Sequence, residues 1–200
     1  MNRIITISRQ FGSGGRTVGK LAAKKLGIKC YDQEIIDKLA SESGFSKEYI
    51  KEQEEESRSP VWFLNTLSNR GVNSLSNQDY IWLAEQKVIE SIAKEGACVI
   101  VGRCADYILR DKGYDLLTVF VHASFEFRKK RIVEVYGETD EPTEKRLLTK
   151  DKRRKAYYQY YTDMKWGDSE HYALSVDTSV IGIERSASFI AEVYSELEKA

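Results

Sequence analysis

The chain has 200 residues, enough for one domain of ordinary size with a small accessory segment. Its 31 basic residues balance 31 acidic ones, so bulk attraction to nucleic acid or an anionic membrane is excluded. No apolar run approaches the ~20 residues that span a bilayer. Cys30, Cys98 and Cys104 lack metal-ligand spacing and are expected to be reduced thiols. The sequence predicts a cytoplasmic protein with no membrane and no nucleic-acid partner.

Short apolar, β-rich runs alternate along the chain with longer segments of helical pattern. The expected strands are 4–7, 28–31, 98–101, 116–121 and 172–176. The expected helices are 17–26, 33–43, 78–95, 124–136, 143–163 and 182–198. Because the strand runs are almost continuously apolar, both faces of the sheet should be buried, which is typical of parallel strands joined by helical crossovers. This pattern predicts an α/β sandwich.

Local signals mark the ends of several helices. Asp32 and Ser46 are expected N-caps, and Gly27, Gly44 and Gly96 are expected C-terminal stops.

Two consecutive segments between the second and third expected helices have no clear strand or core pattern. The charge-dense stretch 47–58 is expected to be a solvated helical face. The stretch 59–78, which contains Trp62 and Phe63, is either a flap over a substrate or a loop packed on the core.

The strongest local signal is the segment Ile7–Lys20, which reads ISRQFGSGGRTVGK. A strand leads in, a glycine cluster turns, and a helical pattern leads out, which is the context of a phosphate-binding loop. Glycines let successive backbone N–H groups converge on an anion, and the helix N-terminus adds roughly half a positive charge there. A plain turn is the alternative. The expected phosphate-binding residues are Gly12, Ser13, Gly14, Gly15, Arg16 and Thr17.

This loop departs from the pattern G-x-x-x-x-G-K-[ST] at two positions. With Gly15 as the second glycine, Gln10 stands in place of the first glycine and Arg16 in place of the lysine. Thr17 then supplies the hydroxyl that contacts Mg²⁺ in such loops. Arginine keeps the charge of lysine but presents a planar fork of donors.

The whole chain resembles the nucleoside monophosphate kinases, and most closely the cytidylate kinase-like family. Besides the loop, four segments carry the resemblance in the family's order. They are YDQEII at 31–36, VIVGRCAD at 99–106, FVHASFEFRKKR at 120–131 and KDKRRKAYY at 150–158.

The resemblance implies a three-layer α/β/α P-loop kinase fold, with a five-stranded parallel sheet and a small helical lid. It implies one domain over 1–200, with the lid at roughly 128–165. The implied reaction is transfer of the ATP γ-phosphoryl group to a nucleoside monophosphate, with Mg²⁺ and with CMP or dCMP as first candidates. A P-loop kinase for another small substrate and a non-catalytic nucleotide-sensing domain stay open as alternatives, as does the oligomeric state.

Phosphoryl transfer depends on holding two anions in line and neutralising the transferred group, so arginines should gather at one cleft. Arg16 is expected on the donor's β- and γ-phosphates, and Arg103 on the acceptor phosphate, although a structural salt bridge would also explain Arg103. The resemblance further implies catalytic lid arginines, of which only one of the consecutive pair should enter the cleft. They are Arg128, Arg131, Arg154 and, as the alternative to Arg154, Arg153.

Asp32 is the best candidate carboxylate for the acceptor nucleotide, and an N-cap would explain it equally well. Cytidylate kinases usually carry an aspartate directly before the Gly-Arg pair, where this chain has Val101. A carboxylate that supports Mg²⁺ must therefore come from Asp32 or Asp106, or be absent.

Overall fold

The computed structural model describes residues 3–50 and 76–199, and within them the strands form one parallel sheet in the order β2-β3-β1-β4-β5. The central strand β1 (Ile4–Arg9) pairs with β3 (Cys98–Val101) and β4 (Leu116–His122). The edge strands are β2 (Lys29–Tyr31) and β5 (Leu174–Asp177). The predicted five-stranded parallel sheet is confirmed.

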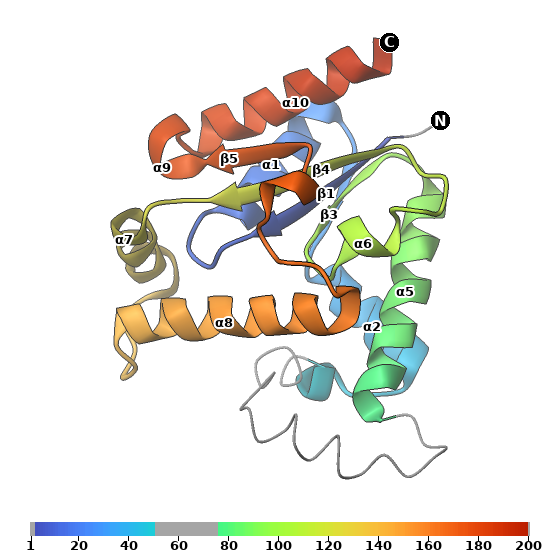
Figure 1. The fold of residues 1–200 in the computed structure, drawn as a ribbon, viewed down its shortest axis with the longest axis horizontal. Helices are drawn as coiled ribbons and strands as arrows, with labels where there is room; N and C mark the ends of the chain where they lie inside the picture. Colours follow the sequence, from blue (N-terminus) through green and yellow to red (C-terminus); the bar gives the residue numbers. More distant parts are fainter. Residues whose placement is uncertain (1–2, 51–75, 200) are drawn as a thin grey trace.

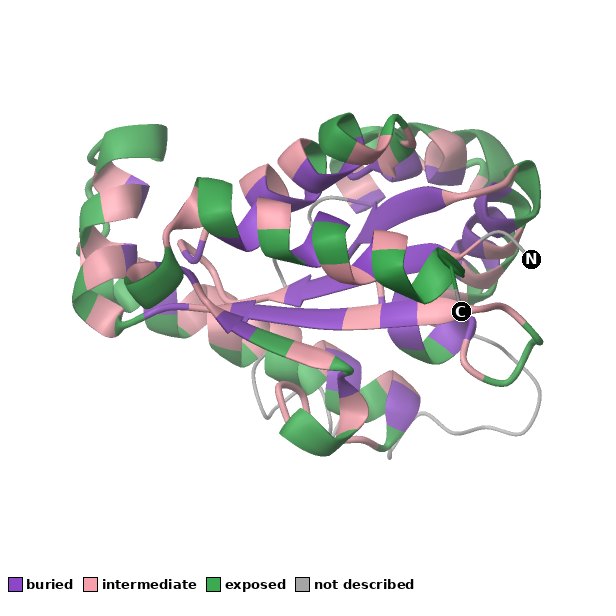
Figure 2. Ribbon diagram, turned by 90° about the horizontal axis from the view of Figure 1, so that it is seen from above, coloured by how far each residue is buried: buried purple, intermediate pink, exposed green. Residues whose placement is uncertain are grey.

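Alternate residues of the apolar strands serve two separate cores. Ile4 packs with helices α2 (Glu34–Ser43) and α5 (Asn77–Glu95), whereas Ile5 packs with α1 (Gly15–Leu26) and α10 (Ile183–Lys199). Figure 2 shows the buried strands lying between helices whose outer sides are exposed. Burial on both faces explains why the strands read as continuous apolar runs, and it gives the three layers expected from the sequence.

The predicted helix ends are largely confirmed. Gly27, Gly44 and Gly96 follow the last residues of α1, α2 and α5, and the Ser46 hydroxyl accepts a hydrogen bond from Tyr49 N–H at 3.1 Å. The expected cap at Asp32 is wrong. Helix α2 has Gln33 at its N-cap, with no side-chain cap bond, and the Asp32 carboxylate pairs with Arg16 instead.

Two helices lie beyond the carboxyl ends of the strands. They are α7 (Phe125–Tyr136) and α8 (Thr143–Thr162), and α8 runs along one side of the sheet in Figure 1. The short elements α6 (Ala105–Ile108), η1 (Ser169–His171) and α9 (Thr178–Ile181) were not expected from the sequence.

Aromatic side chains tie the far end of α8 to α5. Tyr161 stacks on Trp82 with ring centroids 4.5 Å apart, and Tyr157 meets Trp82 edge-on at 6.3 Å. Of the charge-dense stretch 47–58, residues 47–50 are helical, and its remainder and nearly all of 59–78 lie outside the described residues.

All three cysteines are free thiols, as predicted. Burial raises the pKa of Cys30 to about 11 and that of Cys98 to about 12, so both stay protonated and inert. No helix in the described ranges is long and apolar enough to cross a membrane.

Candidate active site

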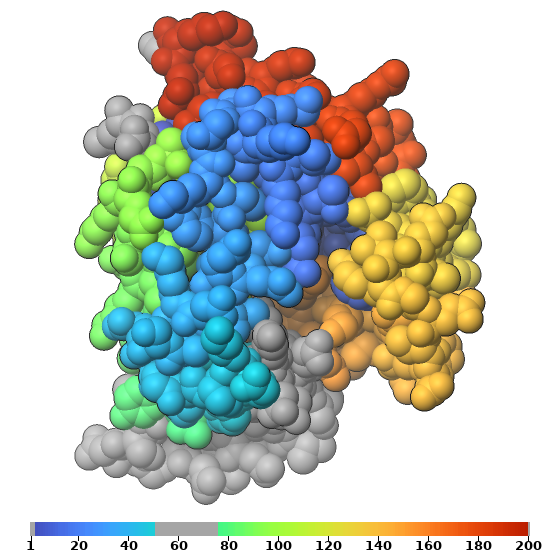
Figure 3. Space-filling view, turned by 180° about the vertical axis from the view of Figure 1, so that it is seen from behind, coloured from blue at the N-terminus to red at the C-terminus, as the bar shows by residue number. Residues whose placement is uncertain are grey.

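A cavity of about 550 Å³ opens at the carboxyl ends of β1, β2 and β3. In open parallel sheets this edge is where ligands bind. The glycine loop and the start of α1 form one wall, and α7 and α8 form the opposite wall. Figure 3 shows the hollow between the blue surface of α1 and α2 and the yellow to orange surface of α7 and α8.

The glycine loop connects β1 to α1 in a conformation that suits anion binding. Gly12 and Gly14 adopt left-handed φ angles of 79° and 81°, which residues with a Cβ rarely adopt. Gly14 is the N-cap of α1, and no side chain caps this helix. The first N–H groups of the helix therefore face the cavity end without an intrahelical acceptor.

Buried Ser13 holds the loop in place. Its hydroxyl donates to the carbonyl oxygens of Gln10 at 2.9 Å and Val121 at 3.1 Å. The hydroxyl of Thr178 donates to the Ser13 carbonyl at 2.6 Å. These bonds tie the loop to the ends of β4 and β5, so Ser13 has a structural role and does not line the cavity.

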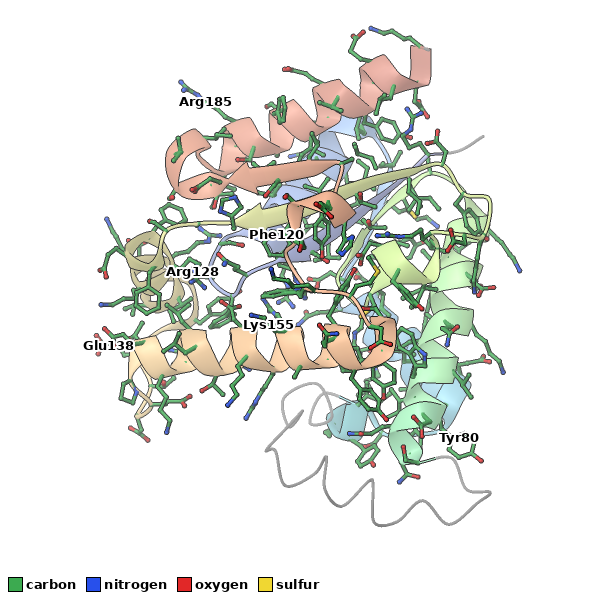
Figure 4. The ribbon with its side chains drawn as sticks, viewed as in Figure 1. Tyr80, Phe120, Arg128, Glu138, Lys155 and Arg185 are labelled. Carbon is green, nitrogen blue, oxygen red and sulfur yellow. The ribbon has the colours of Figure 1, made fainter. Side chains whose placement is uncertain are left out.

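An ion pair between α7 and α8 fastens the outer side of the loop. The Asp151 carboxylate accepts from Phe11 N–H at 2.7 Å and pairs with Arg128 at 2.5 Å. Arg128 also donates to the Phe11 carbonyl at 3.3 Å and lies between α7 and the sheet in Figure 4. Arg128 is not a lining residue of the cavity. The structure thus places it behind the loop, which differs from the expected catalytic position.

Two other predicted residues meet at the start of α1. Arg16 Nε lies 2.6 Å from Asp32 Oδ2, and the Asp32 side chain is only 4% exposed. Beside them, Arg131 donates from Nη2 to the Thr17 hydroxyl at 3.0 Å. All four residues line the cavity, so the structure brings together the start of α1, Asp32 and α7.

Arg103 lines the cavity and forms an ion pair with Glu85, a fully buried carboxylate of α5. The second oxygen of Glu85 accepts from the Tyr157 hydroxyl of α8 at 2.5 Å. Sequence reasoning missed Glu85. The available signal was a charged residue on the apolar stripe of α5, between Ile81 and Val88.

Helix α8 contributes four cationic side chains to the cavity, including both Arg153 and Arg154. The expectation that only one of this consecutive pair faces the cleft is wrong, because long side chains about 100° apart on a helix can flank one cavity. Arg154 Nη1 donates to the Arg9 carbonyl at 2.9 Å and so links α8 to the end of β1.

Strong positive charge distinguishes this cavity from the neutral chain around it. Among the described residues, eight cationic side chains and one carboxylate, Asp32, line it. The cationic residues are Arg9, Arg16, Arg103, Arg131, Arg146, Lys150, Arg153 and Arg154. Asp106 does not line it, being 2% exposed and bound by the Tyr158 hydroxyl at 2.6 Å. The charge fits a polyanionic ligand or two anions side by side.

A phosphate-binding type of loop at this edge of a parallel α/β sheet, facing a cationic cavity, defines the class of P-loop phosphotransferases. Residues 4–180 match the model of the cytidylate kinase-like family, and the chain belongs to that family.

The chain is also similar to individual proteins and solved structures. A cytidylate kinase of Archaeoglobus fulgidus is 28% identical over 161 residues, covering 79% of this chain and 76% of the relative. The crystal structure of an uncharacterized protein from Eubacterium ventriosum is 26% identical, with a TM-score of 0.71, and covers 96% of this chain and 98% of its own. A shikimate kinase from Acinetobacter baumannii shares the fold at 16% identity and a TM-score of 0.56, covering 100% and 96%.

Proposed function

We propose that this protein transfers the γ-phosphoryl group of ATP to the phosphate of a nucleoside monophosphate, with CMP and dCMP as first acceptors. The observation that carries the proposal is that eight cationic side chains of the described residues gather around one cavity, although the chain as a whole is neutral. Two nucleotides bring about six negative charges together, and such a cavity offsets them. The relative named as a cytidylate kinase supports CMP as acceptor.

The donor phosphates would lie on the loop Gly12–Thr17. Backbone N–H groups at the uncapped start of α1 would bind phosphate oxygens, and Arg16 would add a cation there. Mg²⁺ takes oxygen ligands and is usually held by one or two protein groups besides phosphates and water. The Thr17 hydroxyl and the Asp32 carboxylate line the cavity and fit that role, in which the ion would offset phosphate charge.

The acceptor phosphate would lie between Arg103 and Asp32, at the ends of β3 and β2. An oxygen of that phosphate attacks the γ-phosphorus, and the bond from this phosphorus to the β–γ bridging oxygen breaks, leaving ADP. Arg103 is held by a buried ion pair, so its orientation costs little when substrate binds.

We propose a single domain over 1–200 with a lid at roughly 128–165, which covers α8 and most of α7. Arg131, Arg153 and Arg154 of this segment line the cavity from the side opposite the loop. Closing the lid over both nucleotides would bring these cations to the transferred group and exclude water, which suppresses hydrolysis of ATP.

A coupled assay of ADP release tests the proposal, with ATP and Mg²⁺ and a panel of CMP, dCMP, UMP, AMP and non-nucleotide hydroxyl compounds. The expected result is turnover that depends on a pyrimidine nucleoside monophosphate. Turnover with only a non-nucleotide acceptor would contradict the proposal. So would ATP binding without turnover on any acceptor, which is the behaviour of a nucleotide sensor.

A further inference from the structure

The last residue of β1, Arg9, occupies space that two glycines leave open. Gly15 is the first residue of α1, and a Cβ placed on it would overlap the Arg9 Cβ and lie 3.0 Å from Arg9 Cγ. Gly102, at the end of β3, is equally crowded, since its Cβ would overlap Arg9 Nη1 and lie 2.7 Å from Cζ. The Arg9 side chain therefore runs from the start of α1 to the end of β3, across the floor of the cavity.

The observed start of α1 changes the register in which the loop is compared with the phosphate-binding pattern. Gly14 is the left-handed N-cap and Gly15 is the first helical residue. With Gly14 as the second glycine of G-x-x-x-x-G-K-[ST], the first glycine falls on Arg9 and the lysine on Gly15. The hydroxyl position then falls on Arg16, one residue before Thr17. Gly15 therefore stands where the pattern has its lysine and supplies no cation. Arg9 stands where the pattern has its first glycine and supplies one.

The packing at Gly15 explains why the arginine at position 9 and the glycine at position 15 occur together. A side chain leaving the first residue of α1 would pass through the volume that Arg9 fills. The stem of Arg9 crosses that place, and its guanidinium lies at Gly102, at the end of β3. Arg16 is the next residue of α1, and its Nε pairs with Asp32 at 2.6 Å.

We propose that Arg9 replaces the lysine of the phosphate-binding loop and binds the β- and γ-phosphates of the donor nucleotide; this rests on the proposed function. Its guanidinium can bind two phosphate oxygens at once, which a lysine ammonium does only as a point charge. The side chain is held between Gly15 and Gly102, and its backbone carbonyl is bound by Arg154. The cation is therefore positioned before the nucleotide arrives.

Restoring the usual residues of the pattern, a glycine at position 9 and a lysine at position 15, tests this assignment. Arg9→Ala should raise the Kd of ATP about 10- to 100-fold, the effect of losing a charge-assisted hydrogen bond, and lower kcat about 10²-fold. Gly15→Lys alone should also impair ATP binding, because its Cβ overlaps Arg9. Arg9→Gly combined with Gly15→Lys restores the usual pattern and should bind ATP at least tenfold more tightly than either single variant.

The measurement is ATP affinity by titration calorimetry without acceptor, followed by kcat in the coupled assay. Arg185→Ala is the matched control, because Arg185 is exposed on α10 and projects away from the cavity in Figure 4. Arg9→Lys keeps the charge and loses the planar fork of donors. It should bind ATP within about tenfold of the unmodified protein, which shows that the position tolerates substitution.

An unchanged ATP affinity in Arg9→Ala would overturn the assignment, as would a double variant no better than the single ones. Absence of ATP binding in the unmodified protein would overturn both this assignment and the proposed function. ATP binding that depends on Arg9, without transfer to any nucleoside monophosphate, would support the assignment and contradict only the proposed acceptor.

Discussion

Replacing Glu85 by alanine tests the buried network that joins the acceptor side of the cavity to α8. Glu85 is fully buried, and its partner Arg103 has a side chain only 7% exposed. The substitution leaves this cation buried without its carboxylate and removes the acceptor of the Tyr157 hydroxyl. Breaking a buried ion pair by removing one partner costs about 3–5 kcal/mol of unfolding free energy.

Urea denaturation monitored by circular dichroism measures this loss, with Glu90→Ala as the control on the same helix. Glu90 pairs with Lys112 at the surface, with side chains 30% and 38% exposed, and such pairs contribute less than about 1 kcal/mol. Both variants make the same change of helix propensity. A loss of unfolding free energy in Glu85→Ala no larger than that in Glu90→Ala would show that Glu85 does not hold Arg103 in place.

Three other expectations follow from single contacts. Hydrogen bonds from a lysine and a tyrosine lower the pKa of Glu95 from 4.5 to about 2, so its contribution to stability is present above pH 4.5 and is lost as the pH falls toward 2. Glu95→Gln should flatten the pH dependence of the unfolding free energy in that window, measured by urea titration; an unchanged slope refutes it. Asp151→Asn, which weakens the pair with buried Arg128, should cost about 1–3 kcal/mol by the same titration, and an unshifted midpoint contradicts the loop contact. Arg154→Ala and Arg153→Ala should lower kcat about 10²-fold and change the ATP Kd less than about threefold, and a normal kcat in both ends the lid proposal.

The sheet was predictable because its inner strands β1, β3 and β4 are short runs rich in β-branched residues. Both faces of these strands are buried, so polar residues do not alternate with apolar ones along them. The four-residue helices α6 and α9 were missed, since a single turn is too short to show a helical period. Helix α1 was expected to begin at residue 17 and begins at Gly15, because Gly15 and Arg16 carry no apolar signal.

The sequence predicted which residues line the cavity better than it predicted how these residues pair with one another. The glycine loop, Arg16, Asp32, Arg103 and the α8 arginines were found because glycine clusters and strand ends are local signals. The local sequence does not show which residues far apart in the chain form ion pairs. The local sequence does not indicate that Asp32 binds Arg16 and does not cap α2. That contact depends on how the loop and β2 are placed in the folded sheet.

The proposed reaction moves a phosphoryl group from ATP to a nucleoside monophosphate. Its most direct test is incubation with Mg²⁺, CMP and ATP labelled at the γ-phosphorus, followed by separation of the products. We expect label at the β-phosphate of CDP, with little free phosphate. Label found only in inorganic phosphate, or retained in ATP across every monophosphate tested, would contradict it.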